Sequence, residues 1–409
     1  MAGCEPKRER HFVDLWRGDG LHVVELGGGI SAAYGARLLA DFGADVIKVE
    51  APEGGDEARH TGPFPGDEPH PEKSGLFLYL NFNKRAITLD LSDDSGAELL
   101  ARLLVGADVL IENLGPGELD LLPLPEGALH QRLVVCSISP YGQDGPKAEY
   151  LGSEITAFAS GGMMYLTGGG ELEPVKSSLN QAGHLSGLNA ASATLTAAMH
   201  ARATGAGQRI DISEQETVAW IGFPALNLYS HTGGIMRRGK GDVTKLVNSR
   251  PMETSDGWVM PSYAGLGTWW ESFAAFVGVP ELLEEPYLTA QGRAEHAEDI
   301  DRLVGPIFRE KTKQKIFHEG QEWGLTLGAL QTAQEAVQSD QLVERGFFIE
   351  QDHPVAGRVR MPGMVPFTTD VDRTIVAPAP LLGQHSEDVL GALGVSAEEL
   401  ARLTGAGIV

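Results

Sequence analysis

The feature that most constrains this chain is a regular alternation of apolar, strand-like runs and helix-length segments between Leu21 and Ser213. Six such runs predict strands, at 23–26, 45–50, 86–91, 107–112, 133–139 and 208–213. Because helix-length segments join them, the strands are expected to lie parallel, with helices over both faces of their sheet. We therefore expect an α/β fold.

Length and composition indicate more than one domain. The chain has 409 residues, of which 42% are hydrophobic, enough for a large core. The strand rhythm changes in the second half, and a glycine-containing stretch at 233–241 has the character of a linker. We expect a large domain at 1–225, a linker and small domain at 226–335, and a segment at 336–409 that returns to the large domain.

The charge balance excludes some classes of function. With 32 Lys and Arg against 56 Asp and Glu, the net charge is −24, which is unfavourable for a nucleic-acid protein held by phosphate neutralisation.

No run of apolar residues is long enough to cross a membrane, and the start of the chain has no signal-peptide core. The two cysteines, Cys4 and Cys136, cannot make a disulfide framework, and the histidines have no metal-site spacing. We expect a soluble cytoplasmic protein with no metal, no nucleic-acid partner and no membrane contact.

A glycine-rich turn after the first strand offers one functional hypothesis. Residues 27–32, Gly-Gly-Gly-Ile-Ser-Ala, fit the pattern G-x-G-x-x-A between a strand and a helix, and Glu50 ends the next strand. This is close to the dinucleotide fingerprint, in which glycine amides meet a pyrophosphate and an acid holds a ribose. Glycine-rich turns also arise in sheets that bind no nicotinamide, so NAD binding is the weaker reading.

Ordered motifs along nearly the whole chain carry a more specific signal. They are LLADFGADVIKVE at 38–50, GGD at 54–56, NFNKRAITLDL at 81–91, ADVLIEN at 107–113, CSIS at 136–139 with GQ at 142–143 and GP at 145–146, and TG at 204–205 with GQRIDIS at 207–213. Taken together they resemble the class III CoA-transferase family, the CaiB/BaiF group. The resemblance implies a Rossmann-like large domain, a smaller α+β domain and two interlocked subunits, and it explains the glycine turn without NAD.

The resemblance also implies a binding site for coenzyme A or an acyl-CoA substrate. The positions that match the family's contacts are Lys84, Asn113 and Leu114. Lys84 would bring positive charge to the nucleotide phosphates, and Asn113 and Leu114 would line the adenine or pantetheine path. The alternative is that Lys84 is a loop cation and that Asn113 caps a turn at the end of a strand.

The catalytic position departs from the family pattern. Members present a nucleophilic carboxylate in the motif Asp-x-x-x-Gly-x-x-Ala, which here reads from Gly183, so a glycine replaces the Asp. No Asp or Glu occurs from 174 to 210, so a small shift in alignment does not restore it. Glu173 in the preceding loop and His184 are weak candidates for a substitute. The racemase branch needs a His-Asp pair where this chain has Ser153-Glu154, so racemisation is not expected.

We therefore expect the subunit without a nucleophile in a two-subunit class III CoA transferase. Its partner would be a homologous chain that carries the catalytic Asp. This arrangement is similar to the succinyl-CoA:benzylsuccinate CoA transferases of anaerobic toluene breakdown, so the substrates would be a CoA ester and a small dicarboxylic acid. The alternatives are a catalytically silent homodimer that binds CoA esters, and an enzyme of altered chemistry that uses His184.

Overall fold

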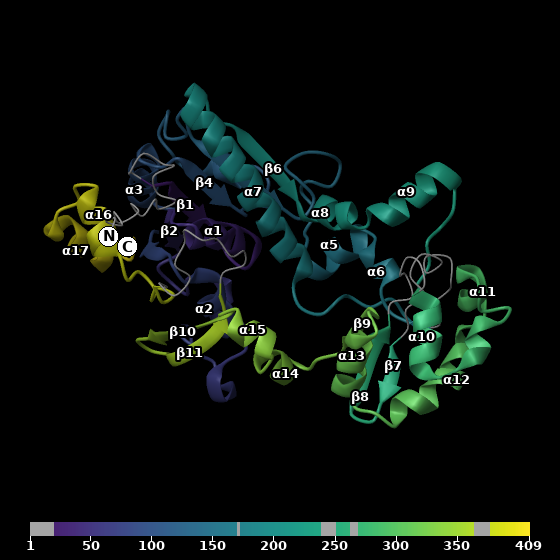
Figure 1. The fold of residues 1–409 in the computed structure, drawn as a ribbon. Coiled ribbons are helices and arrows are strands. Elements are labelled where there is room, and N and C mark those ends of the chain that lie inside the picture. Colours follow the sequence, from purple (N-terminus) through teal and green to yellow (C-terminus); the bar gives the residue numbers. More distant parts are fainter. Residues whose placement is uncertain (1–19, 170–171, 239–250, 262–268, 364–376) are drawn as a thin grey trace, which may run out of the picture. The chain divides into compact units, whose positions relative to one another are not determined.

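In the computed structural model, the predicted strands form one six-stranded sheet in which every neighbouring pair runs parallel. The strand order is β3-β2-β1-β4-β5-β6 (Figure 1). Successive strands are added on one side of β1 up to β3 and on its other side from β4 onward, so the order of addition reverses between β1 and β4. The strands are β1 (His22–Leu26), β2 (Asp45–Glu50), β3 (Arg85–Thr88), β4 (Val109–Glu112), β5 (Val134–Ser139) and β6 (Arg209–Ser213). The expected α/β class is confirmed. In such sheets, ligands bind outside the carboxyl ends of the strands at the point of reversal.

The structure describes residues 20–169, 172–238, 251–261, 269–363 and 377–409. The chain divides into two compact units: the first comprises 1–163, 177–221 and 344–409, and the second comprises 164–176 and 222–343. These limits differ by a few residues from the expected ones at 225 and 335. They also assign the short segment 164–176 to the second unit, whereas the sequence placed it in the large domain.

Helices surround the sheet of the first unit, which also contains a separate antiparallel hairpin. The helices are α1 (Ser31–Asp41), α2 (Gly75–Asn81), α3 (Asp94–Val105), α4 (Glu118–Leu121), α5 (Glu154–Ser160), α7 (Gln181–Thr204), α8 (Glu214–Ile221), α16 (Ser386–Ala392) and α17 (Ala397–Gly405), with short 3-10 turns at Glu57–His60 and Pro65–Asp67. The hairpin pairs β10 (Phe348–His353) with β11 (Gly357–Pro362). Local sequence explains the limits of α3, since Asp93 caps its first turn by accepting from Ser95 N (2.8 Å) and Gly106 ends it.

The sheet is buried on both faces because successive strand residues point to opposite sides. Val24 lies in one apolar cluster with α3 and with the C-terminal helices α16 and α17, whereas Val23 lies in a second cluster with α1 and α7. Two glycines bring α1 and α7 together. A Cβ on Gly187 would lie 2.6 Å from Ser31 O, and one on Gly35 would lie 3.0 Å from Gly187 O. The small residues of α7 thus let its backbone pack closely against α1.

A network of buried charges connects β1 and β2 to the loops that follow the sheet. Lys48 Nζ lies 2.7 Å from Glu25 Oε1 and 2.6 Å from Asp56 Oδ2. Lys84 Nζ lies 2.7 Å from Glu25 Oε2 and donates to the carbonyl of Ala33 and the side chain of Asn81 (2.8 Å each). Burial alone would raise the pKa of Glu25, but the two lysines lower it. Burial lowers the pKa of Lys84 to about 8 despite the attraction of Glu25.

The second unit has its own core. A three-stranded antiparallel sheet, β7 (Met252–Thr254), β8 (Gly257–Pro261) and β9 (Leu327–Ala329), lies with Trp269, Phe273 and Phe308 in a single apolar cluster. The helices in this part of the chain are α6 (Met163–Leu166), α9 (Phe223–Thr232), α10 (Trp269–Val277), α11 (Ala290–Glu295), α12 (Ala297–Arg309), α13 (Lys313–Glu322), α14 (Ala333–Val337) and α15 (Asp340–Glu344), with a 3-10 turn at Pro280–Leu283.

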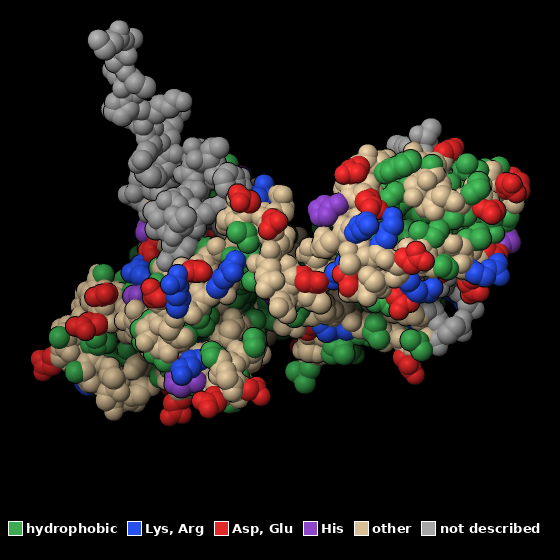
Figure 2. All heavy atoms as spheres, turned by 60° about the horizontal axis from the view of Figure 1, so that its bottom comes forward, with side chains coloured by type: hydrophobic (Ala, Val, Ile, Leu, Met, Phe, Trp, Pro, Cys, Tyr) green, Lys and Arg blue, Asp and Glu red, His purple; other side chains and the backbone are tan. Residues whose placement is uncertain are grey.

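The surface agrees with the acidic composition. On the face shown in Figure 2, acidic side chains are distributed among basic ones over both units and do not gather into one patch. Among the described residues, no helix is both long and apolar enough to cross a bilayer.

Lys84 should make the stability of the chain depend on pH. Its pKa is about 8 in the folded chain against an ordinary value of 10.5, so between these values the unfolded chain binds more protons and stability rises with pH. We expect the free energy of unfolding of the wild type minus that of Lys84→Met to be constant below pH 7. This difference should then rise by up to about 3 kcal/mol by pH 10.5. Urea unfolding of both proteins at pH 7, 8.5 and 10 measures this difference.

The exposed lysine Lys147 provides a matched control. The same comparison with Lys147→Met should show no comparable rise. The difference in free energy of unfolding between wild type and Lys84→Met should increase from pH 7 to pH 10. A difference that stays constant or falls over this range would contradict the lowered pKa of Lys84.

Candidate functional site

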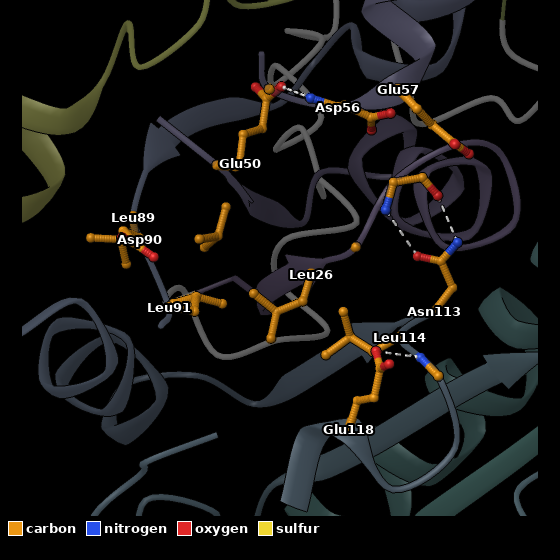
Figure 3. Close-up of a pocket in the computed structure, with 16 residues that line it drawn as sticks. Leu26, Glu50, Asp56, Glu57, Leu89, Asp90, Leu91, Asn113, Leu114 and Glu118 are labelled. Atoms are coloured by element: carbon orange, nitrogen blue, oxygen red, sulfur yellow. Dashed lines mark hydrogen bonds between the residues drawn. The ribbon is translucent and has the colours of Figure 1, made fainter. Parts of the chain in front are cut away.

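A pocket of about 550 Å³ lies at the carboxyl ends of β1, β2 and β4, where the strand order reverses. Figure 3 shows its lining, which includes the leucines Leu26, Leu89 and Leu91. Asn113 and Leu114, both predicted from the sequence, follow β4 and line the pocket. We call this the switch-point pocket. It has the position that a nucleotide site occupies in sheets of this order.

The amides of the glycine turn are already used by side chains of the same chain. Gly28 N donates to Asn113 Oδ1 (3.1 Å), and Asn113 Nδ2 donates back to Gly28 O (2.6 Å), as the dashed lines in Figure 3 mark. Gly29 N donates to Asp56 Oδ1 (2.8 Å). Glu57 lies over the same turn, because a Cβ on Gly29 would meet its Oε1 at 2.4 Å. A carboxylate therefore occupies the side of the turn that a pyrophosphate would approach.

The acid of the dinucleotide pattern is also engaged. Glu50 accepts from Arg59 Nε and Nη2 (2.7 and 2.8 Å) and from Asp56 N (3.0 Å), and it is buried. A bidentate pair of this kind is among the strongest hydrogen-bonded ion pairs. The glycine turn and Glu50 thus serve the internal structure of the chain, and their contacts favour a reading without NAD.

The charged side chains of the switch-point pocket are all acidic. They are Glu50, Asp56, Glu57, Asp90 and Glu118. Glu50 and Asp56 are paired with Arg59 and Lys48. Within the described part of the chain, the other three form no ion pair, and none of the lysines and arginines lines the pocket. The pocket offers apolar walls to a base but no positive charge to phosphates.

Lys84 lies elsewhere than the family resemblance implied. Its ammonium is enclosed by oxygens of Glu25, Ala33 and Asn81, its side chain is 0% exposed, and it does not line the switch-point pocket. A phosphate contact would require breaking the pair with Glu25, and contact of Lys84 with the nucleotide stays a prediction. Contact of Asn113 and Leu114 with CoA stays a prediction.

The first turn of α7 contains Gly183, the position at which the family resemblance implies a nucleophilic Asp. Gly183 N and Ala182 N donate to the two carboxylate oxygens of Glu154 (3.0 and 3.1 Å). A Cβ on Gly183 would lie 3.9 Å from Glu154 Oε2 and 3.1 Å from Ile30 Cγ2. An acidic side chain of another element therefore sits at the helix start, where the amides and the helix dipole favour negative charge. Sequence reasoning did not find this role, since Glu154 is 29 positions from Gly183.

A second carboxyl group lies close to Glu154. Burial raises the pKa of Glu214, the first residue of α8, and the charge of Glu154 raises it further. Both side chains are half-buried, and Glu154 accepts two backbone amides of α7.

The two weaker candidates have different surroundings. His184 Nδ1 donates to Asn180 O (2.6 Å), and its ring packs edge-on against Tyr34 with centroids 4.8 Å apart. These contacts hold the ring as part of the helix start and give no partner that would make it a base. Glu173 is an exposed residue of the second unit. The described residues contain no group of three or more His, Cys, Asp or Glu side chains that could hold a metal ion.

The charge of the switch-point pocket should weaken CoA binding by this chain. The double variant Glu57→Gln/Glu118→Gln removes two unpaired carboxylates, and we expect it to bind CoA at least fivefold more tightly than the wild type, since each removed charge near a phosphate contributes about 1 kcal/mol. Calorimetric titration at low salt measures the difference. Glu98→Gln, at an exposed acid outside the pocket, is the control and should leave CoA affinity unchanged. Equal affinity of wild type and double variant would show that the phosphates do not approach this lining.

Comparison with known proteins agrees with the fold. The family model "CoA-transferase family III" matches residues 19–386. Succinyl-CoA--D-citramalate CoA-transferase of Chloroflexus aurantiacus is 30% identical, with 94% of this chain and 96% of that protein covered. The BbsE subunit of succinyl-CoA:(R)-benzylsuccinate CoA-transferase of Thauera aromatica is 29% identical, with 95% and 97% covered. The crystal structure of a CaiB/BaiF family protein from Brucella suis has a TM-score of 0.80 at 27% identity and covers 92% of this chain and 98% of that one. The chain therefore belongs to CoA-transferase family III, whose members use CoA thioesters as substrates.

Proposed function

We propose that this chain is the subunit without a nucleophile in a hetero-oligomeric class III acyl-CoA:carboxylate CoA transferase. The partner is a homologous subunit that carries the catalytic Asp. In the complex, CoA passes from succinyl-CoA to a dicarboxylic acid such as benzylsuccinate. This chain completes the shared assembly and contributes a substrate pocket but no attacking group.

The observation that carries the proposal is the start of α7. In covalent CoA transfer, a carboxylate of the enzyme attacks the thioester carbonyl and expels CoA, which leaves a mixed anhydride. The CoA thiolate then attacks the enzyme's carbonyl in this anhydride, releases the first carboxylic acid and forms an enzyme thioester, which the acceptor acid attacks in turn. At Gly183 no side chain is present, and the amides of the first turn bind Glu154 instead. Glu154 uses both oxygens to hold the helix start, which is the work of a capping group. A chain built in this way needs its nucleophile from another subunit.

The relatives support the choice of substrates. Succinyl-CoA is named as substrate for the citramalate, glutarate and benzylsuccinate transferases of the comparison. The benzylsuccinate relative is named as a subunit, which supports a division of roles between two chains. In a symmetric or pseudo-symmetric dimer, a folded subunit without catalytic residues still supplies half of the interface.

The native assembly and the activity of the isolated chain test the proposal together. We expect native mass spectrometry of the protein from its source to show this chain with a second, homologous chain of different mass. The purified chain alone should transfer less than about 1% of the CoA that the complex transfers from succinyl-CoA, since loss of a nucleophile costs orders of magnitude in rate. A homodimer that transfers CoA at the rate of related enzymes would overturn the proposal. A homodimer that binds CoA esters without transferring them would support the silent-binding alternative instead.

Restoring the acid should not by itself restore activity. We expect Gly183→Asp to leave the isolated chain without CoA transfer, because the new Cβ would lie 3.1 Å from Ile30 and the new charge would face Glu154. Crowding of this kind typically costs about 1–3 kcal/mol of stability. Gly183→Ala, which adds the same Cβ without charge, separates the two effects in urea unfolding. Transfer by Gly183→Asp alone would mean that Ile30 and Glu154 do not obstruct the position.

A further inference from the structure

A second pocket in the first unit has the opposite charge to the switch-point pocket. It measures about 850 Å³, within the range of small-molecule sites. Its walls come from four segments. They are the loop Thr61–Pro65, Lys73 before α2 with the first turns of α2, the residues Leu179, Asn180, Gln181 and His184 at and before the start of α7, and Val359–Pro362 of β11. All of these belong to the same compact unit. We call it the α7 pocket.

The lining of the α7 pocket combines apolar walls with two cations. Its apolar lining includes Phe64, Leu76, Tyr79, Val359 and Met361. Lys73 and Arg360 line it as well, and no Asp or Glu does so among the described residues. Two cations gathered without a carboxylate are unusual in a chain of net charge −24.

Both cations are available to an incoming anion. In the described part of the chain, neither Lys73 nor Arg360 forms an ion pair. The guanidinium of Arg360 lies over the ring of Phe348, 4.7 Å from its centroid, which leaves its N–H edge for a carboxylate. The neighbouring Arg358 differs, because it pairs with Glu350 across the hairpin and does not line the pocket.

The backbone at the edge of the pocket is strained. Leu179 lies two positions before the first residue of α7 and lines the pocket, and its φ is +61°. A bulky residue with positive φ costs free energy, and such residues cluster at ligand sites, where the surrounding structure maintains them. This supports a pocket shaped for a ligand.

We propose that the α7 pocket binds an organic acid with an apolar body, and that Lys73 and Arg360 recognise its carboxylate. The apolar walls take the body, and the cations take the charge by charge-assisted hydrogen bonds. As the acid site of a CoA transferase, the pocket rests on the proposed function. Binding itself can be measured without transfer and so is tested separately.

The experiment titrates the full chain with three probes by calorimetry at low salt. 3-Phenylpropanoate has the apolar body and the charge, 3-phenylpropanol has the same body without charge, and succinate has charge without the body. We expect 3-phenylpropanoate to bind at least tenfold more tightly than either of the others. Equal binding of the alcohol would overturn recognition by the cations, and equal binding of succinate would overturn the role of the apolar walls.

Variants assign the binding to this pocket. Lys73→Gln and Arg360→Gln should each weaken 3-phenylpropanoate at least fivefold, whereas Arg358→Gln, a matched change on the same strand, should leave it unchanged. If Arg358→Gln weakens binding as much as Arg360→Gln, binding depends on the overall positive charge of this surface and not on Arg360 itself, and the proposal fails. These titrations need no partner subunit. If the chain proves to be a homodimer but binds the probes as expected, the proposed function fails while the proposal for the α7 pocket stands.

Discussion

The pairing of buried charges around Glu25 is the constraint on which the first unit depends. Lys48 and Lys84 both bind its carboxylate, and Lys48 also binds Asp56, at positions almost fully removed from solvent. Charges in such surroundings are tolerated only when each one is paired, because an unpaired buried ion costs several kcal/mol. The network therefore fixes the relative positions of β1, β2 and the loop that follows β2.

The same network determines what the glycine turn can bind. Asp56 uses one oxygen for Lys48 and the other for the amide of Gly29, and Glu57 follows it directly over the turn. A phosphate that approached the turn would have to displace these groups. The network thus holds the loop after β2 against the glycine turn and places Glu57 beside that turn.

The start of α7 relates the second pocket to the missing nucleophile. One turn of this helix contributes Gly183, whose amide binds Glu154, and His184, which lines the α7 pocket. The chain has the family fold, and α7 carries no Asp or Glu. The cationic, apolar α7 pocket lies beside the start of this helix.

The sequence by itself determined the order of strands and helices, the limits of α3, the family, and the lack of an acid on α7, because periodicity, capping residues and motifs are local along the chain. Only the tertiary structure decided which charges meet. Lys84 was expected to face phosphates, yet it binds Glu25, 59 positions away. Glu154 was read as a mismatch to a racemase motif, yet it caps α7 from 29 positions away. The opposite charges of the two pockets were equally hidden, since the partners of a charged side chain are chosen by packing between distant segments, on which local sequence carries no signal.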